Sequence, residues 1–217
     1  MTIKSIVFDL DGVIVESEEL WDQARESLAR ERGGRWSARA QADMMGMSSV
    51  EWSRYMHDVV GLDDSPEEIN REVVRQMLAR YADAPPLIDG AVDAVWRLAE
   101  RWPLAVASSS NREIIDAVLA AAGLASAFRA TVSSEEVGRG KPAPDVYLEA
   151  ARQLDRDPTS CAAIEDSSNG IRSAKAAAMR VVAIPNRGYP PDDDALALAE
   201  VVLGSIRELS PEVVESG

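Results

Sequence analysis

The sequence predicts an α/β fold: a doubly wound parallel sheet with a group of helices inserted after the first strand. Two observations carry this prediction. From residue 85 onward, short apolar runs alternate with segments of helical periodicity, which is the pattern of right-handed crossovers in a parallel sheet covered on both faces. Before that region, residues 17–81 show helical spacing only. A chain of 217 residues suits one such domain with a smaller insertion.

The first strand and the helical insertion follow from local pattern. Residues 3–10 form a β-rich run that ends in acidic residues, so we expect a buried strand followed by a tight loop. Ser65-Pro66-Glu67-Glu68 is a typical helix start, with a cap residue, proline at the first helical position and acids in the first turn. The segments with helical spacing are 18–33, 48–61 and 65–83.

The rest of the chain alternates between the two element types. The expected helices lie at about 90–101, 112–122, 143–154 and 169–178. The expected strands lie at 104–108, 130–133, 161–165, 181–184 and 201–203.

Composition and charge exclude several classes of function. The net charge is −14, so the surface repels nucleic acid and anionic membrane, and we expect neither as a partner. The longest apolar run is too short to span a bilayer. Cys161 is the only cysteine, so no internal disulfide can form, and the N-terminus lacks the pattern of a secretory signal. We therefore expect a cytoplasmic protein that is a monomer or a weak homodimer.

Polar residues of the kinds used in catalysis occur at the strand ends and in one adjoining loop. The ends of open parallel strands meet at one sheet edge, where ligands collect, so we expect these residues to converge. They are Asp9-Leu10-Asp11-Gly12, Ser108-Ser109-Ser110-Asn111, Lys141 and Glu165-Asp166-Ser167-Ser168. Each motif alone is explained by a turn, a helix cap or a surface lysine. All four together, in this order, predict one site.

The chemistry of that set points to phosphoryl transfer. Three carboxylates in one crevice, from Asp9, Glu165 and Asp166, repel one another, and a bound Mg²⁺ removes most of that cost. Serine hydroxyls and turn amides can hold phosphate oxygens, while Lys141 supplies a point positive charge. Asp9 and Asp11 stand two residues apart where the strand ends, which offers a nucleophile and a general acid/base from one segment.

These motifs resemble those of the haloacid dehalogenase superfamily, in the phosphatase and phosphomutase branch with a helical cap after the first strand. DLDGVIVESEELW resembles the first motif, VASSSN the second, GKPAPDVYL the third and IEDSSNGIRSAKAAAM the fourth. The resemblance covers essentially the whole chain. It implies a Rossmann-like core domain at residues 1–16 and 85–217, with the cap domain at residues 17–84.

The resemblance also implies roles for individual residues. Asp9 would form an aspartyl-phosphate, and Asp11 would protonate the leaving group and then activate water or an acceptor hydroxyl. Ser108 and Lys141 would hold the transferring phosphate, with Ser109 and Asn111 as further candidates for binding phosphate or substrate. The implied ligands of Mg²⁺ are Asp9, the backbone carbonyl of Asp11, Glu165 and Asp166.

Asp11 separates the branches of the superfamily, because the dehalogenases lack a carboxylate at that position. A small-molecule phosphatase and a mutase similar to β-phosphoglucomutase then remain. The mutase has a histidine where this chain has Trp21, and a cap arginine for a second phosphate where Gly46-Met47-Ser48 is followed by Ser49.

Both expected mutase groups are therefore missing, unless Arg54 or Arg75 replaces the cation. The motifs SEELWD, EDSSNG and KAAAMR are similar to those of phosphatases acting on hexose or hexitol phosphates. We expect such a phosphatase, with Trp21 and Gly46 on the substrate side of the cap. A mutase is the alternative, and a non-catalytic binding protein on the same fold is the alternative from another class.

Overall fold

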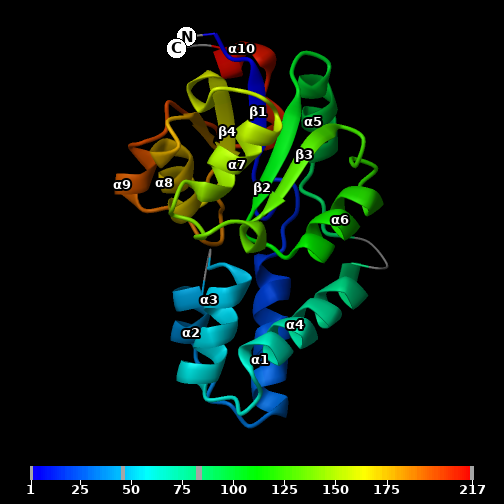
Figure 1. The fold of residues 1–217 in the computed structure, drawn as a ribbon, viewed down its shortest axis with the longest axis vertical. Coiled ribbons are helices and arrows are strands. Elements are labelled where there is room, and N and C mark those ends of the chain that lie inside the picture. Colours follow the sequence, from blue (N-terminus) through cyan, green and yellow to red (C-terminus); the bar gives the residue numbers. More distant parts are fainter. Residues whose placement is uncertain (1, 45–46, 82–84, 216–217) are drawn as a thin grey trace.

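The computed structural model describes residues 2–44, 47–81 and 85–215. Its centre is a six-stranded, all-parallel sheet, which confirms the predicted α/β class (Figure 1). The strand order is β3-β2-β1-β4-β5-β6. The strands are β1 Ser5–Phe8, β2 Leu104–Ser108, β3 Phe128–Ser133, β4 Cys161–Glu165, β5 Arg180–Ala183 and β6 Val201–Val202. The first strand lies between β2 and β4, so its end stands at the middle of the sheet.

Helices cover both faces of the sheet, because alternate residues of each central strand pack in opposite directions. In β1, Ile6 and Phe8 belong to one apolar core and Val7 belongs to a second. The first core includes α5 (Ala91–Ala99) and α6 (Arg112–Ala121). The second includes α7 (Asp145–Gln153) and α8 (Ser168–Ala176). Burial on both faces explains why the strands read as continuous apolar runs.

The helical insertion forms a cap at one end of the molecule, while the two termini lie at the other end (Figure 1). Its elements are α1 Glu18–Glu31, α2 Ala38–Met44, α3 Ser49–Tyr55, a π-helical turn Met56–Val60 and α4 Pro66–Tyr81. Large side chains fill its interior, among them Trp52, Met56 and Met77, each at most 2% exposed. The expected start of α4 is present, because Glu68 accepts hydrogen bonds from the backbone and hydroxyl of Ser65.

Most predicted elements are confirmed, and three short helices were not predicted. The bounds of β2 and β4 match the expected strands at 104–108 and 161–165. The unpredicted helices are α2, α9 (Asp193–Leu196) and α10 (Pro211–Glu215), which are too short to show a clear apolar period. Within the described ranges, no helix has the length and apolar character needed to cross a membrane.

Candidate active site

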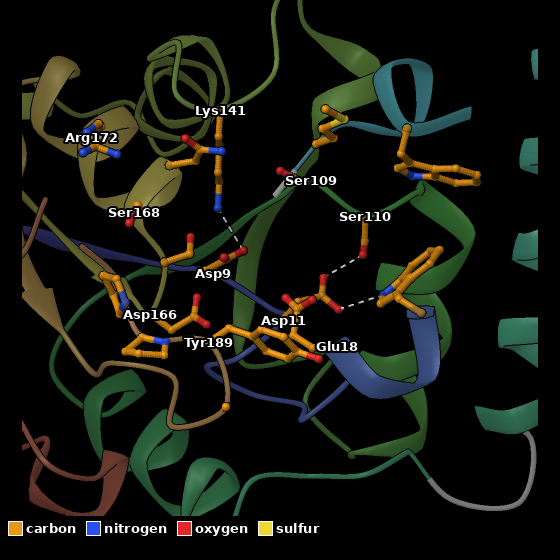
Figure 2. A pocket seen from close by; sticks show the side chains of 18 of the residues that line it. Asp9, Asp11, Glu18, Ser109, Ser110, Lys141, Asp166, Ser168, Arg172 and Tyr189 are labelled. Carbon is orange, nitrogen blue, oxygen red and sulfur yellow. Dashed lines mark hydrogen bonds and ion pairs between the residues drawn. The ribbon is translucent and has the colours of Figure 1, made fainter. Parts of the chain in front are cut away.

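The carboxyl ends of the central strands and the underside of the cap enclose a cavity of about 520 Å³. The core contributes Asp9, Asp11, Ser109, Lys141 and Asp166 to its lining, so residues from all four sequence motifs meet there. The cap contributes Glu18, Trp21, Arg25 and Trp52. Figure 2 shows the side chain of Lys141 pointing at Asp9, with Asp11 and Ser110 beside them.

Asp9 follows the last residue of β1 and is 6% exposed. Its Oδ1 atom accepts a hydrogen bond of 2.7 Å from the backbone N–H of Leu10 and lies 3.0 Å from Nζ of Lys141. Among the described residues, Oδ2 receives no such donor. Burial and the charge of Glu165 raise the pKa of Asp9 well above its usual value, and Lys141 opposes that shift.

Lys141 also pairs with a second buried carboxylate, that of Glu165. Its Nζ lies 2.7 Å from Oε1 of Glu165. The same oxygen accepts a hydrogen bond of 2.6 Å from the hydroxyl of Tyr147. Oε2 of Glu165 accepts from the backbone N–H groups of Asp166 and Ser167. Burial disfavours the charged lysine, but Asp9 and Glu165 outweigh it and hold the pKa of Lys141 above its ordinary value. The ammonium is therefore fixed between two acids.

Asp166 reaches the site only because the backbone at Gly12 leaves room for it. Gly12 has a φ of +76°, and a Cβ atom there would lie 1.9 Å from Oδ2 of Asp166. Only glycine avoids both the left-handed strain and this collision. The glycine of the DLDG motif thus brings the loop after β1 against the end of β4.

Asp9, Glu165 and Asp166 form a group that could hold a metal ion. One oxygen of each lies within 4.8 Å of the others, and all three side chains are buried. Burial, Glu165 and Asp9 raise the pKa of Asp166, so the acids are short of positive charge despite Lys141. Hard carboxylate oxygens in this arrangement fit a divalent cation such as Mg²⁺.

Asp11 stands apart from that group and is held by donors from the core and from the cap. Ser110 donates its hydroxyl to Oδ2 at 2.6 Å, and Ser108 donates to the same atom at 3.4 Å. Ser17 donates to Oδ1, and the indole N–H of Trp21 reaches Oδ1 at 3.3 Å. Trp21, expected to lie on the substrate side of the cap, lines the cavity and orients Asp11.

Of Ser108, Ser109 and Asn111 in the motif after β2, only Ser109 lines the cavity. Ser109 lines the cavity, and its hydroxyl has no hydrogen-bond partner among the described residues. Ser108 is fully buried beneath it. Asn111 does not line the cavity, contrary to our expectation for a substrate-binding residue: Nδ2 donates to Glu135 at 2.7 Å and to Asn70 of the cap at 3.1 Å. Asn111 is the N-cap residue of α6, and its side chain joins the core to the cap through Asn70.

Three other cap residues considered from the sequence lie away from the cavity, and a fourth is not described. Gly46 lies outside the described residues. Ser49 bonds to Glu135 of the core, Arg54 is exposed, and Arg75 pairs with Glu72 on the surface, so none of them lines the cavity.

Arg25 is a cap cation that does line the cavity, and it was not among the residues predicted from the sequence. Arg25 stands four residues after Trp21, and this spacing on one helix face is the signal that could have found it. Tyr147 and Ser17 were not predicted either, although each lies inside a motif, and Ser110 was expected at the site without a role of its own.

Comparison with known proteins places the chain in a family. A sequence model of the haloacid dehalogenase-like hydrolases matches residues 3–178. The chain belongs to this family. The haloacid dehalogenase-like fold explains why the acids at the ends of β1 and β4 face one another beneath a cap.

Relatives within this family include named phosphatases. Hexitol phosphatase B of Escherichia coli (strain K12) is 31% identical over 227 aligned positions, covering 96% of this chain and 95% of that protein. Fructose-1-phosphate phosphatase YqaB of Escherichia coli (strain K12) is 32% identical, with 82% and 94% covered. The crystal structure of CbbY from Rhodobacter sphaeroides in complex with phosphate is 27% identical, with a TM-score of 0.86 and 98% and 99% covered. The chain is thus an enzyme, a haloacid dehalogenase-like hydrolase whose relatives include phosphatases.

Proposed function

We propose that this protein is a Mg²⁺-dependent phosphatase that hydrolyses small sugar phosphates, of the hexose or hexitol type, through an aspartyl-phosphate on Asp9. The observation that carries the proposal is the pairing of Asp9 with Asp11 at one cavity. Asp9 is braced by Lys141 and the Leu10 amide, while Asp11 is turned toward the cap by its own set of donors. Hexitol phosphatase B and the fructose-1-phosphate phosphatase support the substrate class.

In the first step, Oδ2 of Asp9 attacks phosphorus and the bond from phosphorus to the ester oxygen breaks. The electron pair stays on that oxygen, and a protonated Asp11 supplies the proton that completes the alcohol product. Lys141 and the hydroxyl of Ser109, which line the cavity, bind the oxygens of the transferring phosphate, whereas the buried Ser108, expected to do the same, contacts Asp11 instead.

In the second step, Asp11 takes a proton from a water molecule whose oxygen attacks phosphorus. The bond between Asp9 and phosphorus breaks, inorganic phosphate leaves, and Asp11 is protonated for the next cycle. Asp9, the Asp11 carbonyl, Glu165 and Asp166 would hold Mg²⁺. A bound Mg²⁺ neutralises charge on the phosphate and on the acids around it.

We propose that residues 17–84 act as one cap that closes the cavity over the substrate, with the core at residues 1–16 and 85–217. Glu135 of the core supports this role, because it binds Ser49 of the cap and Asn111 of the core through the same oxygen. Trp21 couples the cap to the chemistry through its bond to Asp11. Closing the cap would exclude bulk water from the phosphoenzyme.

Water is proposed as the phosphate acceptor because Trp21 and Ser49 stand where a mutase is expected to have its histidine and its arginine. Trp21 occupies the position of the expected histidine and is already bonded to Asp11. Ser49 occupies the position of the expected arginine and faces Glu135. Neither residue offers a cation or a proton carrier to a second phosphate group.

Phosphate release from a panel of hexose and hexitol phosphates tests the proposal. We expect turnover that requires Mg²⁺ and falls below detection in Asp9→Asn, with Asp11→Asn losing at least about a hundredfold. Undiminished activity in Asp9→Asn, or without divalent metal, rules out the mechanism. A coupled assay for glucose 6-phosphate from β-glucose 1-phosphate, primed with a bisphosphate, tests the mutase alternative. Isomerisation much faster than hydrolysis would establish it.

A further inference from the structure

Arg25 is a buried cation that lines the cavity and forms no ion pair with the residues that the structure describes. It stands on α1, is 8% exposed, and lines the same cavity as Asp9 and Asp11. Within residues 2–44, 47–81 and 85–215, its Nε atom has no hydrogen-bond partner and no carboxylate forms an ion pair with the guanidinium. A buried charge is costly unless it is paired. An isolated guanidinium at the wall of a binding cavity therefore calls for an acceptor from the ligand.

Two indole rings hold the guanidinium in place. Its central carbon lies 5.2 Å from the ring centre of Trp21 and 4.9 Å from that of Trp52. These rings stabilise a cation through their faces but accept no hydrogen bonds in the guanidinium plane. The N–H groups of Arg25 thus stay available, and the rings limit how far the side chain can turn away from the cavity.

The acids that act on the charge of Arg25 do not form hydrogen bonds or ion pairs with its guanidinium. Burial lowers its pKa to about 10, and the charges of Glu18, Asp22 and Asp11 act in the opposite direction, so it remains a cation at neutral pH. Glu18 lines the cavity without forming an ion pair with it. These carboxylates affect the charge of Arg25 only through longer-range electrostatics. The N–H groups of its guanidinium can therefore donate to a ligand.

We propose that Arg25, between Trp21 and Trp52, forms a subsite that binds an anionic group at the end of the substrate remote from the transferred phosphate. This inference rests on the proposed function, which defines the phosphate attacked by Asp9 as the reacting end of the substrate. A carboxylate or a second phosphate presents two oxygens that match the guanidinium fork and cancel its charge. A hydroxyl offers one acceptor and no charge. Within the proposed class of small sugar phosphates, we therefore expect a substrate with an anionic group at the remote end, a sugar-acid phosphate or a bisphosphate, to be hydrolysed faster than a hexose or hexitol monophosphate, which stays a substrate.

The decisive experiment compares esters that differ only at the remote end. Gluconate 6-phosphate carries a carboxylate where glucitol 6-phosphate carries a CH₂OH group, and glucitol 1,6-bisphosphate carries a phosphate there. We expect kcat/KM for one of the two anionic esters to exceed that for glucitol 6-phosphate by about tenfold or more, the size of one charge-assisted hydrogen bond. The anion that gains more identifies the source of the charge.

Substitution of Arg25 then decides whether it is the residue responsible. In Arg25→Gln, the preference for the anionic ester over glucitol 6-phosphate should fall at least about tenfold, and in Arg25→Lys, which keeps the charge but loses the fork, it should fall less. Arg54→Gln, at an exposed arginine of the same cap, should keep the wild-type preference. A preference unchanged in both Arg25 variants, or a wild-type preference for the neutral ester, overturns the proposal.

Binding measurements separate this proposal from the proposed function. Calorimetric titration of gluconate 6-phosphate and of the bisphosphate into Asp9→Asn reports the subsite without turnover. Binding that weakens about tenfold when Arg25→Gln is added supports the subsite even if the wild-type enzyme hydrolyses neither ester. Hydrolysis that depends on Asp9, together with binding indifferent to Arg25, supports the phosphatase and overturns the subsite. Thermal unfolding of each variant shows that it is folded, and Arg25→Lys supplies the answer if Arg25→Gln unfolds.

Discussion

A methyl group at Gly12 would lie 1.9 Å from Oδ2 of Asp166, so the loop after β1 and the end of β4 fit together only around a glycine. The φ of +76° at Gly12 adds a second constraint. We expect Gly12→Ala to lose at least about a hundredfold in kcat/KM, because Asp166 must move away from Asp9. Left-handed strain should also lower the free energy of unfolding by about 1–2 kcal/mol.

Gly123→Ala is the matched control for that substitution. Gly123 has a φ of +67°, and a Cβ atom there would meet nothing within 4 Å. It should lose the same 1–2 kcal/mol of stability, roughly, but keep wild-type kinetics. Urea unfolding and phosphate release measure the two effects. Equal kinetic losses in both variants would mean that backbone strain, and not the contact with Asp166, is responsible.

The ion pairs of Lys141 predict a variant that is both inactive and unstable. Lys141→Met leaves Asp9 and Glu165 buried without their cation, so in metal-free buffer the free energy of unfolding should fall by about 3–5 kcal/mol. Turnover should fall about a hundredfold or more. Lys175→Met, which breaks the surface pair with Glu200, should cost no more than about 1 kcal/mol. A loss of stability in Lys141→Met as small as that in Lys175→Met would contradict the burial of Lys141 between Asp9 and Glu165.

Much of this arrangement could be predicted from the sequence, and the reason lies in the strands. The runs that form β2 and β4 end where apolar residues give way to polar ones, so their last residues and the acids beyond them could be located without a structure. A parallel sheet brings such ends to one edge. The convergence of Asp9 and Asp166 on one cavity follows from these two facts, and Lys141 reaches it from the loop between β3 and α7.

Contacts between the cap and the core could not be predicted in the same way. Asn111 and Glu135 are 24 residues apart, and their pairing with Ser49 depends on how the cap docks. Arg25 stands in a helix rich in charged residues, where an arginine ordinarily faces solvent. Its burial results from two indole rings, one of them on a different helix, so α1 alone could not reveal it.

The acid group predicts that Mg²⁺ stabilises the folded protein. At a concentration one hundred times the dissociation constant, a ligand that binds only the folded state contributes about 2.7 kcal/mol. For a chain of this length, that corresponds to a rise in melting temperature of roughly 5–10 °C. Asp166→Asn should abolish most of the rise, whereas Asp63→Asn, at an exposed acid of the cap, should keep it. Scanning calorimetry with and without Mg²⁺ checks this, and an equal rise in both variants would place the cation elsewhere.

The hydrogen bond from Ser49 to Glu135 predicts a change in substrate binding. The bond is 2.8 Å long and ties the cap to the core. Ser49→Ala removes it, so the closed form should be less populated and KM should rise about threefold to tenfold, with kcat changed less. Ser53→Ala, whose hydroxyl bonds only to the carbonyl of Val50 in the same helix, is the control. A KM that rises equally in both variants would indicate damage to α3 instead of a lost contact with the core.

Glu18 predicts a dependence of stability on pH that a single substitution isolates. Burial and the charge of Asp11 raise its pKa from 4.5 to about 7. Between these two values the folded state holds a proton that the unfolded state has released, so stability falls as pH rises through this window. Relative to Glu18→Gln, which cannot ionise, the wild type should lose roughly 2–3 kcal/mol between pH 4.5 and pH 8.

Urea unfolding of the wild type and of Glu18→Gln at several pH values measures that difference directly. Groups that do not interact with Glu18 titrate alike in both proteins and cancel in the comparison. Glu19→Gln, at the exposed neighbouring acid of α1, should follow the wild type across the whole range, because it leaves Glu18 unchanged. A constant difference between the wild type and Glu18→Gln from pH 4.5 to pH 8 would show that Glu18 ionises normally in the folded protein. The cavity wall beside Arg25 would then be more hydrated than its burial implies.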